Sequence, residues 1–372
     1  MADIKIPSEF LPVDGRFGCG PSRVRQAQID AFAQHGAKLM GTSHRQAPVK
    51  NLVKRVQEGL MDLYHNPEGY EIVIGDGGST AFWDVASFSL AEGKAQALVH
   101  GEFGGKFASA LKAPWLTAPT VINGTPGSRL ELQAEAGVSL YAYAQNETST
   151  GVVTPVRRVA GADEGALFLT DATSAAGGID FDPTETDVYY FAPQKNFASD
   201  GGLWFALMSP AAFERAERVA GSGRYIPEFL SLKTAIDNSR LNQTLNTPAI
   251  ATLFLLAEQI DWMNGNGGLA WADARTKAAS DHIYNWAEAT SFATPFVANP
   301  EHRSQVVATI DFDDSIDAAA IAKVLRANGV VDTEPCRKLG RNQLRIATFT
   351  AVELADVQQL TKCIDYVVGE LG

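Results

Sequence analysis

The sequence predicts an α/β fold in which a large, mostly parallel sheet domain is followed by a smaller C-terminal α/β domain. From about residue 70, short apolar runs alternate with helix-like stretches. The apolar runs are nearly continuous in Val, Leu, Tyr and Phe, which is typical of strands buried on both faces. Alternation of such strands with helices favours a parallel sheet. The length of 372 residues allows two domains.

Seven strands are expected in the larger domain. They fall in YEIVIGDGGS (70–79), AQALVHGEF (95–103), PTVIN (119–123), SLYAYAQNETSTG (139–151), ALFLTDATSAAGG (166–178), DVYYFAPQK (187–195) and LWFALMS (203–209). Helices are expected between the first three of these strands and again in AAFERAERVA (211–220). The pattern therefore gives strand, glycine turn and helix at the start of the domain.

The pattern changes after residue 209. Residues 221–248 predict a long irregular connection, and connections of this length usually carry function or reach a partner. A helix is expected from Pro248, with Thr247 as its cap, and GNGG (265–268) interrupts it. Beyond that break, the order strand, helix, strand, helix predicts a small domain. The expected division is an N-terminal arm at 1–20, a large domain at 21–265 and a small domain at 266–372.

Composition excludes several classes of function. The formal net charge of -12 argues against nucleic acid or an anionic membrane as the main partner. The three cysteines, Cys19, Cys336 and Cys363, show neither zinc-ligand spacing nor a disulfide framework, and no metal is expected. The first residues lack a signal-peptide pattern, and no apolar run approaches the roughly 20 residues that span a bilayer. These features predict a cytoplasmic protein.

Polar residues follow four of the predicted strands, where open α/β sheets bind their ligands. GDGGST (75–80) offers glycines and N–H groups at a helix start, which suit a phosphate. Asn146 and Thr148 follow another strand, and Asp171 and Lys195 follow two more. Each feature alone has an ordinary explanation as a turn, a loop, a helix cap or a surface lysine.

The order of these features indicates pyridoxal phosphate (PLP) chemistry. Lys195 follows Asp171 by 24 residues on the same predicted sheet. A lysine amine can form a Schiff base with the PLP aldehyde, and a carboxylate can keep the pyridine nitrogen protonated. The glycine-rich helix start would then hold the phosphate. A phosphate site, an aspartate and a lysine in this arrangement match the needs of that cofactor.

Motifs across nearly the whole chain carry a family resemblance. They are GTSHR, GDGGST, GEFGG, QNETSTG, LTDATSAAGG, APQKNFASDGGLW, LNTP and QLRIATF, in that order. The sequence resembles the class V, fold-type I PLP-dependent aminotransferases, and among them the phosphoserine aminotransferases of actinobacterial type. The resemblance implies a homodimer with shared active sites. It also implies ping-pong transamination between glutamate and 3-phosphohydroxypyruvate, giving O-phosphoserine and 2-oxoglutarate in serine biosynthesis.

The resemblance also implies roles for individual residues. Lys195 carries the cofactor as a Schiff base, and Asp171 pairs with the pyridine nitrogen. The other implied cofactor contacts are Gly78, Ser79, Phe103, Thr148 and Gln194, with Asn246 and Thr247 from the neighbouring subunit. Phe103 stacks on the ring in this reading, although the family more often presents a tryptophan there.

Basic residues are expected to bind the two anionic groups of each expected substrate. Arg345 is implied to bind the α-carboxylate, while His44, Arg45 and Arg337 meet the phosphate or distal carboxylate. The planar fork of arginine suits both anions. Cys336 stands where the family often has a histidine, so one phosphate donor is missing or replaced. The family also makes 4-phosphohydroxythreonine a possible second substrate.

Three other functions remain open at the level of the sequence. An alanine–glyoxylate-type aminotransferase shares the fold, but the basic SHR element argues against small uncharged substrates. A cysteine desulfurase needs a mobile nucleophilic cysteine, for which Cys336 is the candidate. Gln194, however, precedes the lysine where such enzymes typically have a histidine. A non-enzymatic regulatory protein on this scaffold is disfavoured by the acidic charge.

Overall fold

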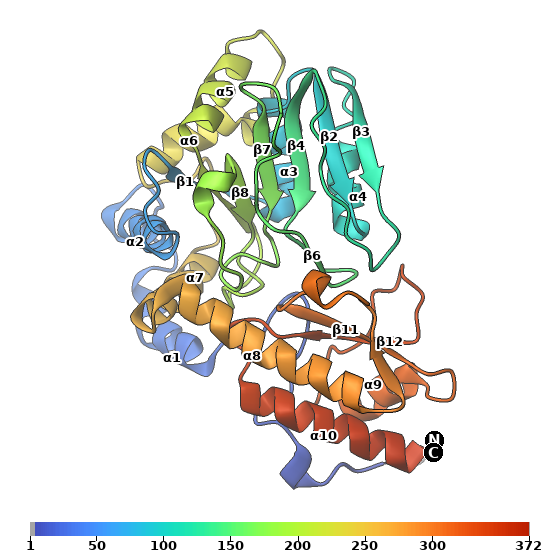
Figure 1. The fold of residues 1–372 in the computed structure, drawn as a ribbon. Coiled ribbons are helices and arrows are strands. Elements are labelled where there is room, and N and C mark those ends of the chain that lie inside the picture. The colour runs from blue at the N-terminus through green and yellow to red at the C-terminus, as the bar shows by residue number, and fades with distance from the viewer. Residues whose placement is uncertain (1–3, 372) are drawn as a thin grey trace.

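A seven-stranded sheet forms the centre of the larger part of the molecule in the computed structural model, which describes residues 4–371 (Figure 1). Its strands are β1 (Glu71–Asp76), β2 (Lys94–Val99), β3 (Thr117–Asn123), β4 (Val138–Ala144), β7 (Leu167–Asp171), β8 (Val188–Phe191) and β9 (Leu203–Met208). Their order is β1-β9-β8-β7-β4-β2-β3. β9 is antiparallel to both neighbours, and the other adjacent pairs are parallel. The seven predicted strands are confirmed.

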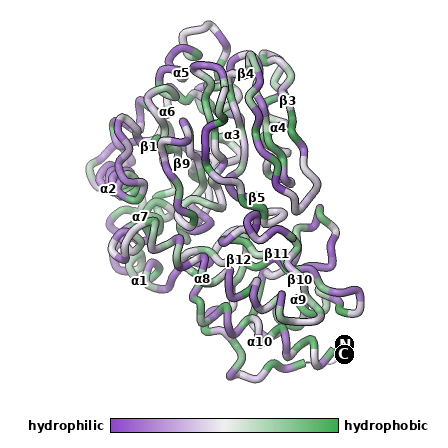
Figure 2. Tube along the Cα trace, in the orientation of Figure 1, coloured by the Kyte–Doolittle hydropathy of each residue, from purple (hydrophilic) through white to green (hydrophobic). Residues whose placement is uncertain are grey.

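Helices cover both faces of this sheet. One set is α3 (Gly78–Ser89), α4 (Glu102–Ala110), α5 (Pro210–Ala220) and α6 (Leu232–Arg240), and the other includes α1 (Gln26–His35), α2 (Ala47–Leu63) and α7 (Ile250–Gly265). Along β8, Tyr190 packs with the first set and Tyr189 with the second, because successive strand residues point to opposite faces. Hydrophobic strands therefore fill the interior (Figure 2), and the prediction of two buried faces is confirmed.

The connection after α5 contains a helix, so the prediction of an irregular segment is wrong. α6 lies within it, preceded by a short 3-10 helix, Glu228–Leu230. Ser231 caps α6, because its side chain accepts a hydrogen bond from the backbone N–H of Thr234. Leu232 and Ile236 are fully buried against the sheet. The long run of polar residues hid this short amphipathic helix.

The predicted start of the next helix is also wrong by two residues. α7 begins at Ile250 and has no side-chain cap. Thr247 instead places its Oγ1 3.2 Å from Nδ1 of His44. The hydroxyl is therefore engaged by another segment of the chain and not by the helix end.

The C-terminal part is built on a three-stranded antiparallel sheet. Its elements are α8 (Gly268–Ala289), β10 (Ala293–Pro295), β11 (Val307–Phe312), α9 (Ala318–Ala327), β12 (Gln343–Ala347) and α10 (Leu354–Leu371). The predicted order of strand, helix, strand and helix from residue 304 is confirmed, and the short β10 was not predicted. The break at GNGG is confirmed, since α7 ends at Gly265 and α8 begins at Gly268.

The N-terminal segment, described from residue 4, runs along this C-terminal part. The Phe17 N–H donates to the Val331 carbonyl, and the Ala347 N–H donates to the Phe17 carbonyl. The segment predicted as an arm thus extends β12 by backbone hydrogen bonds. The rings of Phe10 and Tyr366 pack 6.0 Å apart, so this segment also lies against α10. The division of the chain at residues 20 and 265 stays a prediction.

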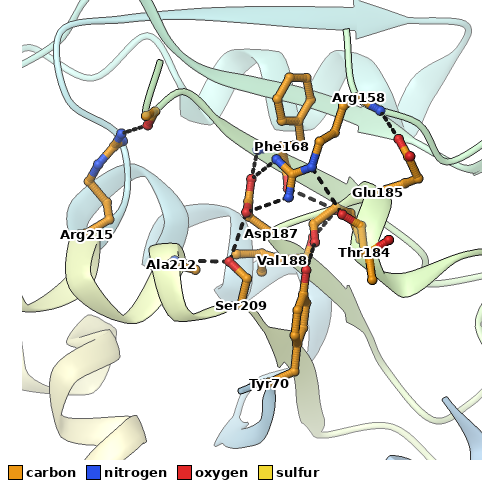
Figure 3. Close-up of polar contacts among 12 residues, drawn as sticks. Tyr70, Arg158, Phe168, Thr184, Glu185, Asp187, Val188, Ser209, Ala212 and Arg215 are labelled. Carbon is orange, nitrogen blue, oxygen red and sulfur yellow. Dashed lines mark hydrogen bonds and ion pairs between the residues drawn. The ribbon is translucent and has the colours of Figure 1, made fainter. Parts of the chain in front are cut away.

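A buried carboxylate ties together the amino ends of β7 and β8 (Figure 3). Asp187, whose side chain is 3% exposed, accepts both terminal guanidinium nitrogens of Arg158 at 3.0 and 2.9 Å. It also accepts the Phe168 N–H and the Ser209 hydroxyl, each at 2.9 Å. Four donors satisfy the charge, so the start of both strands is fixed at the end of the sheet opposite the strand ends that carry the predicted site.

Replacing this carboxylate is expected to destabilise the fold without altering ligand binding. Asp187→Asn keeps the size of the side chain but places an amide N–H₂ among hydrogen-bond donors. We therefore expect the free energy of unfolding, measured with urea, to fall by about 2–4 kcal/mol. Glu71→Gln is the control, because it removes a pair with Arg240 in which both side chains are more than 40% exposed. That control should cost less than about 1 kcal/mol. Equal losses would contradict the role given to Asp187.

Candidate active site

The carboxyl ends of β1, β2, β4, β7 and β8 meet at one edge of the large sheet, which faces the C-terminal part (Figure 1). A cavity of about 230 Å³ lies at this edge. Seven of the nine residues expected to contact the cofactor line it, and they are Gly78, Ser79, Phe103, Thr148, Asp171, Gln194 and Lys195. The loops that follow separate strands are therefore gathered around one small space, as parallel strands require.

Lys195 is a buried amine in the wall of this cavity. Its side chain is fixed by a hydrogen bond from Nζ to the carbonyl oxygen of Cys19. Burial lowers the pKa of Lys195 to about 8, because the charged form loses its hydration. Gly20 leaves the space that the amine occupies, since a Cβ at that position would lie 2.0 Å from Nζ. The N-terminal segment thus holds the lysine in place.

Asp171 ends β7 with its carboxylate held on both oxygens. Oδ1 accepts the Thr173 N–H at 2.9 Å and lies 2.6 Å from the Thr173 hydroxyl. Oδ2 accepts the indole N–H of Trp83 at 3.0 Å. The Thr173 hydroxyl also lies 2.7 Å from the Ser79 hydroxyl, which links the aspartate to the start of α3. The carboxylate consequently has a fixed direction within the cavity.

The start of α3 has the character of an anion site. Gly77 and Gly78 adopt φ values of 105° and 71°, which glycine accepts at little cost. No side chain caps the helix, so the N–H groups of its first turn are not taken by a neighbouring residue at that end. Free N–H groups and the helix dipole both favour a bound anion. The predicted glycine-rich cradle therefore opens on the same cavity as Lys195.

A short hairpin, β5 (Asn146–Glu147) with β6 (Val152–Val153), fixes the start of α4. The carboxylate of Glu147 is 1% exposed and accepts the N–H groups of Phe103 at 3.3 Å and Gly104 at 2.9 Å. The Ser149 hydroxyl accepts the Glu102 N–H at 2.9 Å. Burial raises the pKa of Glu147, and these N–H donors oppose that rise. The hairpin thereby sets the position of the Phe103 ring in the cavity wall.

The remaining predicted residues do not line the cavity. Thr247 contacts His44, and the neighbouring Arg45 donates to Gln243 at 2.9 Å. The backbone N–H of Asn246 interacts with the carboxylate of Asp76 at the end of β1. Arg337 is exposed on the loop after Cys336.

Arg345 comes nearer to the cavity than the other predicted substrate residues. It lies on β12, is half-buried, and donates from Nη1 to the carbonyl of Thr148 at 3.0 Å. Since Thr148 lines the cavity, this bond brings the C-terminal sheet to its edge.

Sequence reasoning missed three residues that shape the site. Trp83 sits inside the helical stretch TAFWDVASF, where an aromatic residue suggests only core packing. Thr173 follows Asp171 by two residues, a spacing at which a side chain can bond back to the carboxylate, and this signal was available. Glu147 lies in NET, and nothing local connects it with the distant start of α4.

Comparison with known families decides the class of the protein. The family model described as Aminotransferase class-V matches residues 19–333. The chain belongs to the class V aminotransferases. The lysine, the aspartate and the glycine-rich helix start that meet at the cavity all lie within the matched residues.

Curated class V relatives match along the whole chain. A phosphoserine aminotransferase from Nocardioides sp. is 60% identical over 370 residues, covering 99% of each chain. The phosphoserine aminotransferase of Rhodococcus opacus is 59% identical over 368 residues, covering 99% of this chain and 98% of the relative.

Solved structures confirm the predicted fold-type I architecture. Phosphoserine aminotransferase from Cytophaga hutchinsonii superposes with a TM-score of 0.85 at 21% identity, covering 95% of this chain and 99% of the other. The PLP-bound phosphoserine aminotransferase from Trichomonas vaginalis superposes with a TM-score of 0.82 at 18% identity, and the alignment covers 95% of this chain and 99% of the other. No helix within residues 4–371 is long and apolar enough to cross a membrane.

The lowered pKa of Lys195 predicts its reactivity in the protein without cofactor. Reductive methylation with formaldehyde, followed by mass spectrometry of the peptide containing Lys195, should show a pH midpoint near 8. For an ordinary lysine, with a pKa of about 10.4, the pH midpoint of the reaction lies about two pH units higher, because only the neutral amine is nucleophilic. A midpoint near 10 would contradict the burial of this amine.

Proposed function

We propose that this chain transfers the amino group of glutamate to 3-phosphohydroxypyruvate with PLP as cofactor, giving O-phosphoserine and 2-oxoglutarate in serine biosynthesis. One observation carries the proposal. A buried lysine and an oriented aspartate share a cavity with an uncapped helix start, in a chain 60% identical over its length to the phosphoserine aminotransferase of Nocardioides sp.. Ping-pong kinetics follow from such chemistry.

The residues of the cavity fit PLP. Besides the amine and the carboxylate, the buried Asn146 Oδ1 and Gln194 Oε1 have no hydrogen-bond partner within the described chain, as befits a site that takes a polar ligand. In the proposed arrangement, the start of α3 would hold the phosphate with Gly78, Ser79 and Gln194. Phe103 and Thr148 would contact the ring and its hydroxyl.

The two charged residues divide the proton chemistry. Bound PLP supplies an aldehyde that condenses with amines and a ring that accepts electrons from an adjacent C–H bond. Lys195 takes the α-proton of the amino acid at Nζ, since a pKa of about 8 keeps the amine available as a base near neutral pH. Asp171 would keep the pyridine nitrogen protonated with a carboxylate whose two oxygens are held by Trp83 and Thr173, one each.

Arginines are proposed to bind the substrate anions. Arg345, which reaches the carbonyl of Thr148, takes the α-carboxylate through its fork of N–H groups. The Nε of Arg345 is buried without a partner in residues 4–371, so this guanidinium has a free donor. Arg337 then meets the phosphate. In the proposed division at residue 265, the small domain supplies both arginines to a site on the large domain.

The partner subunit is proposed to complete the site. His44, Arg45, Asn246 and Thr247 do not line the cavity of their own chain, although Thr247 contacts His44. A homodimer with shared active sites would bring these residues of the partner subunit to this cavity.

The protein is proposed to be cytoplasmic. Its three cysteines are unpaired, as is usual in the reducing cytoplasm.

The reading as a cysteine desulfurase finds no support in the position of Cys336. The residue is buried, and its thiol donates to Oε2 of Glu102 at 3.6 Å. A mobile nucleophile requires an exposed and flexible position. The alanine–glyoxylate aminotransferase of Nostoc sp. superposes with a TM-score of 0.78 at 18% identity, which shows a common fold alone.

Removing the Lys195 amine tests the function. Lys195→Ala should lower aminotransferase activity on phosphoserine and 2-oxoglutarate by at least about 10³-fold, because the covalent link and the base are lost together. The absorbance of the Schiff base with the lysine should also vanish. Lys277→Ala on the surface of α8 is the control and should leave both unchanged. Full activity in the Lys195→Ala protein would refute the proposal.

Shared active sites predict complementation between two inactive variants. Lys195→Ala and Arg45→Ala subunits, unfolded and refolded together, should form hybrid dimers in which one of the two sites is intact. Random pairing makes half of the dimers hybrid, so about a quarter of wild-type activity should return. Sedimentation of the mixture checks the dimer. If no activity returns from a dimeric mixture, each chain supplies its own Arg45.

A further inference from the structure

We propose that Trp83 is a positioning residue for Asp171, fixing the carboxylate oxygen that meets the pyridine nitrogen of the cofactor. The inference rests on the proposed function and concerns a contact between two side chains of this chain. Trp83 and Asp171 are 88 residues apart in sequence, and their side chains are joined by a hydrogen bond of 3.0 Å. Both residues are buried, at 7% and 6% exposure.

The distribution of donors on the carboxylate singles out one oxygen. A carboxylate oxygen accepts about two hydrogen bonds. Oδ1 of Asp171 already receives the N–H and the hydroxyl of Thr173. Among the hydrogen bonds of regular geometry within residues 4–371, Oδ2 receives that of the Trp83 indole N–H, so it keeps one acceptor position. The oxygen left for the cofactor is therefore the one that the indole holds.

The surroundings make this single donor important. No salt bridge to Asp171 is formed within residues 4–371. The neighbouring strand contributes Tyr190, whose buried hydroxyl faces the Asp171 carboxylate and the Trp83 indole but makes no hydrogen bond of regular geometry within residues 4–371. The Lys195 amine also interacts electrostatically with this carboxylate, but the hydrogen bonds to it come from neutral donors, and each one lost leaves a buried charge less well solvated. Loss of the indole N–H should also free the carboxylate to turn.

Helix α3 explains why the indole can serve this purpose. Ser79 and Trp83 are four residues apart, which places both side chains on one face of the helix. Both line the cavity, Ser79 beside the glycine turn and Trp83 beside the aspartate. Trp83 also lines a second hollow of about 710 Å³, so its ring forms part of the wall between the two spaces. A substitution must keep that wall in order to test the N–H alone.

Two replacements remove the N–H while keeping an aromatic wall. Trp83→Phe is the simple variant, and β-(3-benzothienyl)alanine at position 83 is an isostere in which sulfur replaces the N–H. Trp115→Phe is the matched control, because Trp115 donates to the Ser87 carbonyl at 3.2 Å but does not line the cavity. The isostere answers the question if Trp83→Phe fails to fold. Thermal unfolding of each protein without cofactor reports folding.

The measurements are the PLP dissociation constant of the apoprotein and the separate values of kcat and KM. Both Trp83 replacements should weaken PLP about tenfold and lower kcat about tenfold, with KM changed less than twofold. Trp115→Phe should stay within twofold of the wild type in all three. Wild-type PLP affinity in both replacements, with the wild type fully active, would overturn the role of Trp83 and leave the proposed function standing.

A double-mutant cycle shows whether Trp83 acts through Asp171. In an Asp171→Asn background, Trp83→Phe should change the PLP dissociation constant less than twofold, because the carboxylate that it positions is gone. An equal tenfold effect in both backgrounds would mean that the indole contributes only packing and would overturn the inference. A wild-type protein that binds no PLP would instead refute the proposed function itself.

Discussion

The parallel direction of β2, β4, β7 and β8 is the constraint on which the site depends. Parallel strands end at the same edge of a sheet, so residues that are far apart in the sequence meet there. Asp171 ends β7 and Lys195 follows β8, and both line one cavity. The antiparallel β9 lies between β8 and β1 and lets β1 run in the same direction as β8. The glycine-rich turn after β1 thereby reaches the same edge.

Hydrogen bonds to neutral groups stabilise most of the buried charged side chains at this edge. The Lys195 amine bonds to the Cys19 carbonyl, the Asp171 carboxylate to Thr173 and Trp83, and the Glu147 carboxylate to N–H groups of α4. Buried groups held by fixed dipoles keep their directions without a counter-ion of their own. A ligand that carries both a phosphate and a protonatable ring then meets charges that are already oriented. This arrangement explains how a small cavity can hold a strongly charged cofactor.

The sequence predicted the elements well wherever the pattern was local. Continuous apolar runs marked the strands, and the residues directly after them, such as Asp171 and Lys195, were correctly placed together. The prediction was wrong where short-range signals compete. The polar residues of α6 concealed its buried side, and Pro248 suggested a helix start two residues before Ile250.

Contacts between distant segments lay beyond the reach of the sequence. The indole of Trp83 meets a carboxylate 88 residues away, and Glu147 caps a helix that begins 45 residues earlier. Such pairs depend on how helices pack over the sheet, which local periodicity does not encode. The approach of the N-terminal segment to Lys195 is of the same kind, since the amine fills the space beside Gly20 that a side chain would take.

The attachment point of the cofactor tests the account most directly. The protein loaded with PLP can be reduced with borohydride, digested, and analysed by mass spectrometry, which reveals the lysine that carries the pyridoxyl group. The account predicts one stoichiometric adduct on the peptide that contains Lys195. An adduct on another lysine, or none after full loading with PLP, would contradict it.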